Sequence, residues 1–524
     1  MRAALPRPSG LLLSLVLAGA ACREPPPPPP PPVDPRIDVP GEAPAPPAVA
    51  AFGGPPPATP EPATAQERFS LALTGHRRKA YTGDLEDLRK RAVLRVLTRN
   101  NSTSYFLYKG VEAGFDYELA SWIADEMGVR LEMVVSPTQR ELVPWLLDGK
   151  GDLILAGLST SGARADRVQF TRPYIRTPWV VVVKKASAPK GAKKKKKAAE
   201  PALPTLTRLE DLAGKDVVVK PSSGAMKRLR ELEIPGLAPR AAKETEESED
   251  LLDEVGEGKA FACIVEERIA KVELMHRADL EIALALPGAD DEAALATRKE
   301  DVKLAAFMDA FLEQNLKNTR WNLMWRRYHS WKDETGSVRN DELRADREGR
   351  ITPWDEVFEK VGAEHDVDWR LLAAQCYQES RFDPAARSHM GAVGVMQFLP
   401  TTAKELGCAD PAVPKEAIRC AGRFVGKLAK RYSEPEVALK DRVRFALAAY
   451  NAGPGHLDDA RVLAKAQGLD ANRWFGNVET AMLLLSKPRF YEQARHGFAR
   501  GEETVRYVSE IQTRYDAYVG LAQP

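Results

Sequence analysis

A single carboxylate, Glu379, stands at the end of a stretch whose pattern predicts a helix. Apolar residues recur at three- and four-residue spacing from Trp369 to Tyr377, which is typical of a helix with one face in a core. Glu379 is therefore expected at the wet end of a buried helix. A carboxyl group held there beside apolar neighbours has its pKa raised, as a general acid working near neutral pH requires. The alternative interpretation is an ordinary solvated charge.

Four motifs follow one another from this helix towards the C-terminus. They are ESRFDP (379–384), SHMGAVGVMQFLPTTA (388–403), AYNAG (449–453) and ETVRYV (503–508). In this order they resemble the lytic transglycosylases with a goose-type lysozyme fold. The resemblance implies that Glu379 is the catalytic acid and that six residues line a glycan cleft: Ser388, Met396, Gln397, Tyr450, Asn451 and Glu503. Core positions for Met396 and Tyr450, and a helix-capping role for Glu503, remain open as alternatives.

The chemistry of that family explains why one carboxylate suffices. Hydrolytic glycosidases generally use two carboxyl groups. A lytic transglycosylase uses the C6 hydroxyl of N-acetylmuramic acid as nucleophile, so one group can protonate the leaving oxygen and later accept a proton. The resemblance implies cleavage of peptidoglycan glycan strands to 1,6-anhydro ends. Candidate donors to the transition state are the backbone around Gly391 and Gly394 and the amides of Gln397 and Asn451.

Residues 66–332 alternate short β-rich runs with amphipathic helical stretches. Strands are predicted at 94–98, 131–135, 152–156, 179–184, 216–220, 261–265 and 282–286. The alternation predicts an α/β fold with mostly parallel sheets. Three segments, GFDYELA (114–120), GLSTSGARADRVQFTRPY (157–174) and LAGKDVVVKPSSG (212–224), resemble the periplasmic solute-binding proteins of family 3. That resemblance implies a two-lobed domain that closes around a ligand.

Four residues match ligand-binding positions of the solute-binding family. Arg164 matches the arginine that clamps the ligand α-carboxylate, and Glu266 stands where the family has an Asp facing the ligand amine. Ser222 and Ser223 precede a predicted helix and could present backbone donors to an anion. The implied regulatory ligand is an amino acid or a muropeptide. Residues 162–163 differ from the family's Pro-Glu, and a structural ion pair is the alternative role for Arg164.

The N-terminus carries a predicted signal peptide at residues 1–22. Arg2 and Arg7 precede the apolar run LLLSLVLAGAA and Cys22, and this run is too short to span a bilayer. Its end resembles the lipobox of bacterial lipoproteins, which implies a lipid on Cys22. Because Arg23 is not Asp, the expected location is the periplasmic face of the outer membrane. Gly19 stands where the lipobox usually has Leu, so cleavage by signal peptidase I is the alternative.

The remaining segments divide the chain into domains. Residues 23–65, with eight consecutive prolines, predict a disordered tether, for which an inconsequential tail is the alternative. The lysine run at 193–197 predicts a solvated loop, with contact to anionic envelope polymers as the alternative. Residues 333–350 form a predicted linker. Residues 351–524 predict an all-α lysozyme-like domain, with helices around 354–361, 419–431, 443–450 and 503–518.

Charge and cysteine content narrow the functions further. The 76 basic and 74 acidic residues give a net charge of +2, which gives no reason to expect nucleic acid. Cys263 and Cys376 lie in apolar runs and are expected to be buried. Cys408 and Cys420 are expected to form a disulfide, since the compartment is oxidising. The sequence has no CxxC, HExxH or phosphate-loop motif, so no metal or cofactor is expected. The alternative function is a non-catalytic periplasmic sensor or peptidoglycan-binding lipoprotein.

Overall fold

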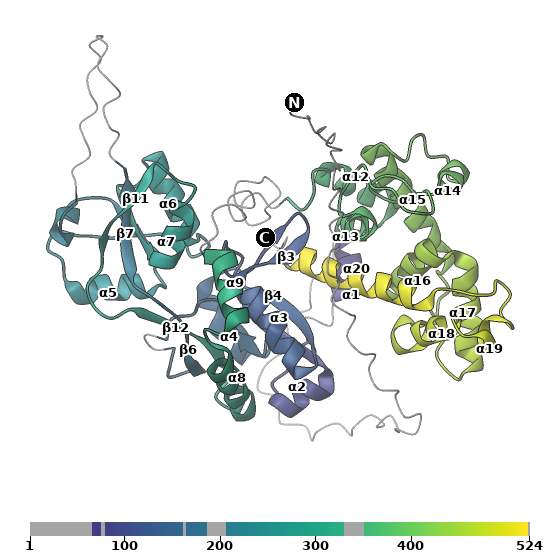
Figure 1. The fold of residues 1–524 in the computed structure, drawn as a ribbon, viewed down its shortest axis with the longest axis horizontal. Coiled ribbons are helices and arrows are strands. Elements are labelled where there is room, and N and C mark those ends of the chain that lie inside the picture. The colour runs from purple at the N-terminus through teal and green to yellow at the C-terminus, as the bar shows by residue number, and fades with distance from the viewer. Residues whose placement is uncertain (1–64, 75–78, 161–163, 186–205, 330–349, 522–524) are drawn as a thin grey trace, which may run out of the picture. The chain divides into compact units, whose positions relative to one another are not determined.

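The computed structural model describes residues 65–74, 79–160, 164–185, 206–329 and 350–521. The predicted signal peptide with Cys22, almost all of the tether, the lysine run 193–197 and most of the linker lie outside these ranges. Along the chain, an α/β part built on two sheets is followed by a helical part (Figure 1). Within the described ranges, no helix combines the length and the hydropathy that crossing a bilayer requires.

The first lobe is built on a five-stranded sheet in the order β4-β1-β5-β12-β6. Its strands are β1 (Val93–Thr98), β4 (Arg130–Val135), β5 (Leu153–Ile154), β6 (Gln169–Thr177) and β12 (Asp291–Thr297). Helices α3 (Phe115–Met127), α8 (Val302–Asn315) and α9 (Thr319–His329) share a core with one face of the sheet, and α4 (Leu142–Leu147) packs on the other. Helix α2 (Leu85–Arg91) precedes β1, and β2 (Phe106–Tyr108) pairs with β3 (Val111–Ala113).

The second lobe has its own five-stranded sheet in the order β11-β7-β10-β8-β9. The strands are β7 (Trp179–Lys184), β8 (Val217–Val219), β9 (Arg240–Ala241), β10 (Ala262–Glu266) and β11 (Leu280–Ala285). Helix α5 (Gly224–Leu232) covers one face, and α6 (Ser248–Glu257) and α7 (Glu267–Leu274) cover the other. Because Val180 and Val182 face one core while Val181 faces the other, β7 is apolar at successive positions.

The expectation of mostly parallel sheets is wrong. Among the described strands of the two sheets, β1–β4, β1–β5, β8–β10 and β8–β9 are parallel. The pairs β5–β12, β6–β12, β7–β10 and β7–β11 are antiparallel. The chain passes from the first sheet to the second between β6 and β7 and returns between β11 and β12. The predicted strands were found near their expected positions, but β6 contains Pro173 and β12 is alanine-rich, so neither gives a strong strand pattern.

Residues 350–521 form the helical part. Its helices are α12 (Asp355–His365), α13 (Trp369–Ser380), α14 (Pro400–Glu405), α15 (Pro414–Arg431), α16 (Leu439–Ala452), α17 (Pro454–Ala466), α18 (Glu479–Leu484), α19 (Pro488–Tyr491) and α20 (Gly501–Leu521). The four predicted helices are confirmed as parts of α12, α15, α16 and α20. Helix α13 is central, because it packs against α12, α15 and α20 and buries its apolar face between them.

Helix α1 (Ala65–Thr74) packs into this helical core although it comes first in the chain. Phe69 and Leu73 are buried in the same core as the apolar face of α13, and α1 contacts α12 and α16. The expected range 66–332 for the α/β domain is therefore corrected at its start. Its first helix is covered by the C-terminal helices, a long-range contact that its own sequence does not reveal.

Candidate active site and interlobe cleft

The two ends of α13 explain where Glu379 lies. At the N-terminus the Asp368 carboxylate caps the helix and also accepts a hydrogen bond from the Tyr515 hydroxyl at 2.8 Å. At the C-terminus Arg381 and Phe382 have positive φ angles of 55° and 64°, so the helix stops directly after Glu379 and Ser380. The carboxyl group is thus held at the end of a helix whose apolar face is buried.

Two buried side chains form a hydrogen-bond chain that ends on Glu379. The Tyr507 hydroxyl of α20 donates to Glu379 Oε1 at 2.5 Å, and Gln375 Nε2 donates to the Tyr507 oxygen at 3.1 Å. Burial raises the pKa of Glu379 to about 8; the Tyr507 hydrogen bond lowers it and the negative charge of Glu503 adds to the rise. Glu379 is therefore protonated at neutral pH, the state in which a carboxyl group acts as a general acid.

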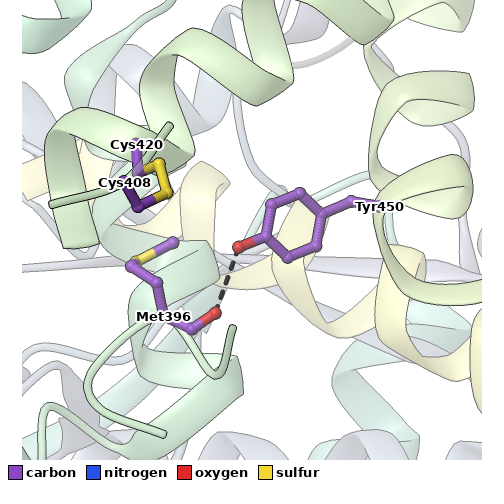
Figure 2. Close-up of a disulfide and its surroundings, with 4 residues drawn as sticks. All are labelled: Met396, Cys408, Cys420 and Tyr450. Atoms are coloured by element: carbon purple, nitrogen blue, oxygen red, sulfur yellow. Dashed lines mark hydrogen bonds between the residues drawn. A yellow bond between two sulfur atoms is a disulfide. The ribbon is translucent and has the colours of Figure 1, made fainter. Parts of the chain in front are cut away.

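The loop after α13 is tied to the end of that helix. The Val395 carbonyl accepts hydrogen bonds from Ser380 Oγ at 2.8 Å and from Cys376 Sγ at 3.4 Å. Tyr450 of α16 donates its hydroxyl to the Met396 carbonyl at 3.0 Å (Figure 2). The Met396 side chain is fully buried, as in the core alternative for this residue, so its backbone carbonyl makes the contact with Tyr450.

The same loop uses its polar side chains to hold its own shape. Gln397 Nε2 donates to the carbonyls of Ala386 at 3.1 Å and Gly394 at 2.8 Å. Ser388 Oγ accepts from the Ala392 N–H at 3.0 Å. The amide NH₂ group of Gln397, which was expected to donate to the substrate, is therefore already hydrogen-bonded to the loop backbone. In this arrangement Gln397 and Ser388 shape the loop beside Glu379.

Asn451 and Glu503 lie where α16 and α20 meet. Thr504 Oγ1 donates to Asn451 Oδ1 at 2.8 Å and so links the two helices. Glu503 is exposed in the first turn of α20, where a negative charge is also favourable for the helix. Tyr507 lies one turn further along α20. The sequence carried a signal for it, because the four-residue spacing in ETVRYV places Glu503 and Tyr507 on one helix face.

The cysteines occupy two kinds of environment. Cys408 and Cys420 are joined in a disulfide with their Cα atoms 5.8 Å apart, which connects the segment after α14 to α15 (Figure 2). Cys263 and Cys376 are free and buried, as their apolar surroundings predicted. Among the residues that the structure describes, no cluster of His, Cys, Asp or Glu could hold a metal ion.

The four residues expected to bind one ligand in the α/β part do not share one cavity. Arg164, Ser222 and Ser223 line a cavity of about 340 Å³, where Arg164 Nη2 donates to the Ser222 carbonyl at 2.6 Å. Glu266 lines a second cavity of about 50 Å³, and of the other three residues only Ser223 borders both. Ser223 also caps α5, the helix predicted to follow it. The two cavities share Gln139 and Ser223, so a ligand held between Arg164 and Glu266 would have to span both.

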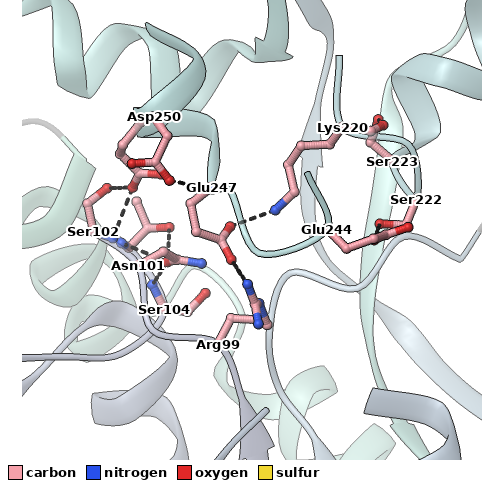
Figure 3. A network of polar contacts seen from close by, with 12 residues as sticks. Arg99, Asn101, Ser102, Ser104, Lys220, Ser222, Ser223, Glu244, Glu247 and Asp250 are labelled. Atoms are coloured by element: carbon pink, nitrogen blue, oxygen red, sulfur yellow. Dashed lines mark hydrogen bonds and ion pairs between the residues drawn. The ribbon is translucent and has the colours of Figure 1, made fainter. Parts of the chain in front are cut away.

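Ion pairs and hydrogen bonds join the two lobes beside these cavities. Arg99, at the end of β1, donates to the Glu247 carboxylate at the start of α6, and Lys220 Nζ donates to the same carboxylate at 2.7 Å (Figure 3). The Ser102 N–H donates to Glu249 Oε1 at 2.9 Å. The charged groups of the lobes thus satisfy one another across the cleft, in a network that the sequence motifs did not indicate.

Glu266 has a partner that the motifs also missed. Arg268, two residues further along, donates to Glu266 Oε2 at 2.5 Å and to Thr103 Oγ1 of the first lobe at 3.2 Å. Asp291 accepts a hydrogen bond from Ser159 at 2.8 Å and borders the same small cavity. The acidic residues that line this cavity are Glu247, Glu266 and Asp291, and the basic ones are Arg99, Lys220 and Arg268.

Two families of known proteins match the chain. Residues 94–330 match the bacterial extracellular solute-binding proteins, family 3, and residues 356–472 match the transglycosylase SLT domain. The second match ends before α20, which supplies Tyr507.

Individual relatives and solved structures are also similar to parts of the chain. The membrane-bound lytic murein transglycosylase F of Stutzerimonas stutzeri (strain A1501) is 32% identical over 444 residues, which are 84% of this chain and 87% of the relative. The membrane-bound lytic murein transglycosylase F of Ectopseudomonas mendocina (strain ymp) is 30% identical over 458 residues, which are 87% of this chain and 90% of the relative. The amino acid ABC transporter substrate-binding protein AbpA from Streptococcus pneumoniae, bound to L-arginine, is 23% identical with a TM-score of 0.41, covering 48% of this chain and 98% of that one. Holo ArgBP from T. maritima is 26% identical with a TM-score of 0.37, and the match covers 47% of this chain and 99% of that one.

Proposed function

Because the chain belongs to the membrane-bound lytic murein transglycosylase F family, we propose that Glu379 is the single acid and base with which it cleaves peptidoglycan. The protein is a peptidoglycan lytic transglycosylase with a solute-binding-protein-like domain. The observation that supports the role of Glu379 is its place at the end of α13, protonated at neutral pH and hydrogen-bonded to Tyr507.

The reaction can be written with this one carboxyl group. Glu379 donates its proton to the glycosidic oxygen between N-acetylmuramic acid and N-acetylglucosamine, and the bond from that oxygen to C1 breaks. The C6 hydroxyl of the same N-acetylmuramic acid then bonds to C1, and its proton passes to the Glu379 carboxylate. Between the two steps the Tyr507 hydroxyl stabilises the carboxylate by donating to it. The products are a 1,6-anhydro end and a free 4-hydroxyl, with no water consumed.

Digestion of purified sacculi tests this function, with the released fragments weighed by mass spectrometry. Anhydro-muropeptides are expected as the main product. Reducing-end muropeptides, which are heavier by one water, would mean hydrolysis. No release at all would favour the sensor or peptidoglycan-binding alternative, which the family relationship and the position of Glu379 do not favour.

The pH dependence of turnover should follow Glu379. Since the folded-state pKa of Glu379 is about 8, the acid form predominates at lower pH and disappears as the pH rises through that value. We expect turnover on soluble glycan strands to fall along an alkaline limb centred near this pKa. An alkaline limb centred near pH 4.5, the ordinary pKa of a Glu, would contradict the assignment.

We propose that the cleft between the lobes is the regulatory site for an amino acid or muropeptide ligand. The 50 Å³ cavity is too small for a muropeptide while Arg99 and Glu247 hold the lobes together, so such a ligand must open them. Arg164 is the proposed carboxylate partner, since it lines the larger cavity. Calorimetry with amino acids and muropeptides should show binding that Arg164→Ala weakens and Arg167→Ala does not, because Arg167 borders the same cavity but is exposed. Equal binding by wild type and Arg164→Ala would remove Arg164 from the site.

We propose that a lipid on Cys22 anchors the mature protein to the periplasmic face of the outer membrane. The support comes from the lipobox-like end of the leader and from the relatives, which are named membrane-bound. The protein is expected in the membrane fraction, and Cys22→Ala is expected to release it, because two or more acyl chains anchor stably whereas one is marginal. A wild-type protein that is wholly soluble and carries no lipid by mass spectrometry would refute this.

A further inference from the structure

One polar side chain lies in the middle of the buried face of α13. Gln375 is fully buried, and the helix residues around it that face the core are apolar: Leu371, Leu372, Ala374 and Cys376. Burying an amide costs free energy unless its polar atoms are hydrogen-bonded. An apolar residue at this position would fit the core without that cost, so the amide calls for an explanation beyond packing.

Within the described ranges, the Gln375 side chain hydrogen-bonds only to the Tyr507 hydroxyl, which in turn contacts Glu379. Nε2 donates to Tyr507 at 3.1 Å, whereas among the described residues the carbonyl oxygen Oε1 has no partner. A tyrosine hydroxyl has a single proton and can also accept. Since its oxygen accepts from Gln375, the proton of Tyr507 is directed to Glu379 Oε1 at 2.5 Å.

This direction decides which oxygen of Glu379 carries the acid proton. Oε1 accepts from Tyr507, so the proton of the neutral carboxyl group is placed on Oε2. We propose that Gln375 is a positioning residue that fixes the direction of the chain from Gln375 through Tyr507 to Glu379, and so keeps the transferable proton on Oε2. The proposal deepens, and rests on, the proposed acid role of Glu379.

The strength of the Tyr507 hydrogen bond depends on the same amide. Burial and the nearby Glu379 charge raise the pKa of Tyr507, whereas the Gln375 hydrogen bond lowers it. A more acidic hydroxyl is a stronger donor, and this favours the carboxylate that Glu379 becomes after giving up its proton. Gln375 therefore acts in both halves of the reaction, through Tyr507 and without contact to the sugar.

Two substitutions of Gln375 distinguish its effect on the direction of the Tyr507 hydrogen bond from its effect on core packing. Gln375→Met keeps the length of the side chain but replaces the amide donor by an apolar group. Gln375→Glu offers an acceptor that draws the Tyr507 proton away from Glu379. Gln378→Leu is the matched control, because Gln378 lies on the same helix but bonds to Glu510 and Arg514 on the outer side. Turnover on sacculi is measured for each, together with the pKa of the Glu379 carboxyl by ¹³C NMR, whose signal is assigned by its loss in Glu379→Gln.

For Gln375→Met we expect about a 3- to 10-fold lower kcat with KM unchanged, as loss of one neutral hydrogen bond implies. Its Glu379 pKa and alkaline limb should move upward, because Tyr507 then donates more weakly. Gln375→Glu should lose more turnover than Gln375→Met, and Gln378→Leu should match wild type. In a Tyr507→Phe background, Gln375→Met should cause no further loss.

Either of two results would overturn the role of Gln375. One is wild-type kcat and an unchanged Glu379 pKa in Gln375→Met. The other is the same fractional loss with and without the Tyr507 hydroxyl, which would mean that Gln375 only fills space. If the wild type releases no anhydro products, the proposed function fails instead, and the NMR comparison of wild type with Gln375→Met still decides whether Gln375 acts on Glu379.

Discussion

Replacing Glu379 by glutamine should abolish the release of anhydro-muropeptides while leaving the fold and glycan binding intact. The amide is nearly isosteric, and its Oε1 can still accept from Tyr507, but it has no acidic proton to give to the glycosidic oxygen. A positioned general acid contributes roughly 10² to 10⁴ to the rate, and here the same group also serves as the base. Turnover on sacculi, followed by mass spectrometry of the fragments, measures the loss.

Two controls make the loss of activity in Glu379→Gln interpretable. Gln378→Leu changes a side chain of the same helix that bonds to Glu510 and Arg514 rather than to Glu379, so most of the turnover should persist. Thermal unfolding gives the second control. Between the ordinary pKa of 4.5 and the folded-state value of about 8, the unfolded chain releases a proton that the folded protein keeps, so this group lowers stability as the pH rises. Glu379→Gln should therefore unfold at a higher temperature than wild type at pH values above this range, and at the same temperature as wild type below it. Turnover near that of wild type in Glu379→Gln would end the assignment.

Local sequence patterns were sufficient for the part of the site that lies on one helix. The spacing of apolar residues predicted α13 and the position of Glu379 at its end, because a helix with a buried face repeats its pattern every turn. That Tyr507 and Gln375 are in contact could be learned only from the structure. They are separated by 132 residues, and only the packing of α20 against α13 brings the hydroxyl and the amide together.

The errors in the fold have the same physical origin. Alternating β-rich and helical stretches predicted the strands, but pairing direction depends on where the chain crosses between lobes, which leaves no local pattern. Helix α1 carries its apolar residues Phe69 and Leu73 like any amphipathic helix, and nothing in its sequence says that α12 and α16 cover them. Arg164 and Glu266 follow family positions, yet partners such as Ser222 and Arg268 place them beside different cavities.

Gly394 should be the residue that least tolerates a side chain in the loop between α13 and α14, which we call the catalytic loop. Its φ of +74° lies in the left-handed region, and a Cβ there would approach the Pro411 carbonyl oxygen to 2.3 Å. Gly391, three residues earlier in the same loop, has a φ of +83° but no atom within 4 Å of its Cβ position. The two glycines therefore share the conformational requirement and differ in steric contact, which makes Gly391→Ala the matched control for Gly394→Ala.

Both substitutions should cost about 1–2 kcal/mol for a left-handed alanine, and Gly394→Ala roughly 1–3 kcal/mol more for the overlap with Pro411. The overlap should also displace the neighbouring Val395 carbonyl, which receives the Ser380 and Cys376 hydrogen bonds at the end of α13. We therefore expect Gly394→Ala to lower both the calorimetric unfolding midpoint of the helical part and the turnover on sacculi, whereas Gly391→Ala keeps most of both. Equal melting and equal turnover in the two variants would show that the segment around Pro411 yields easily and does not hold the catalytic loop in place.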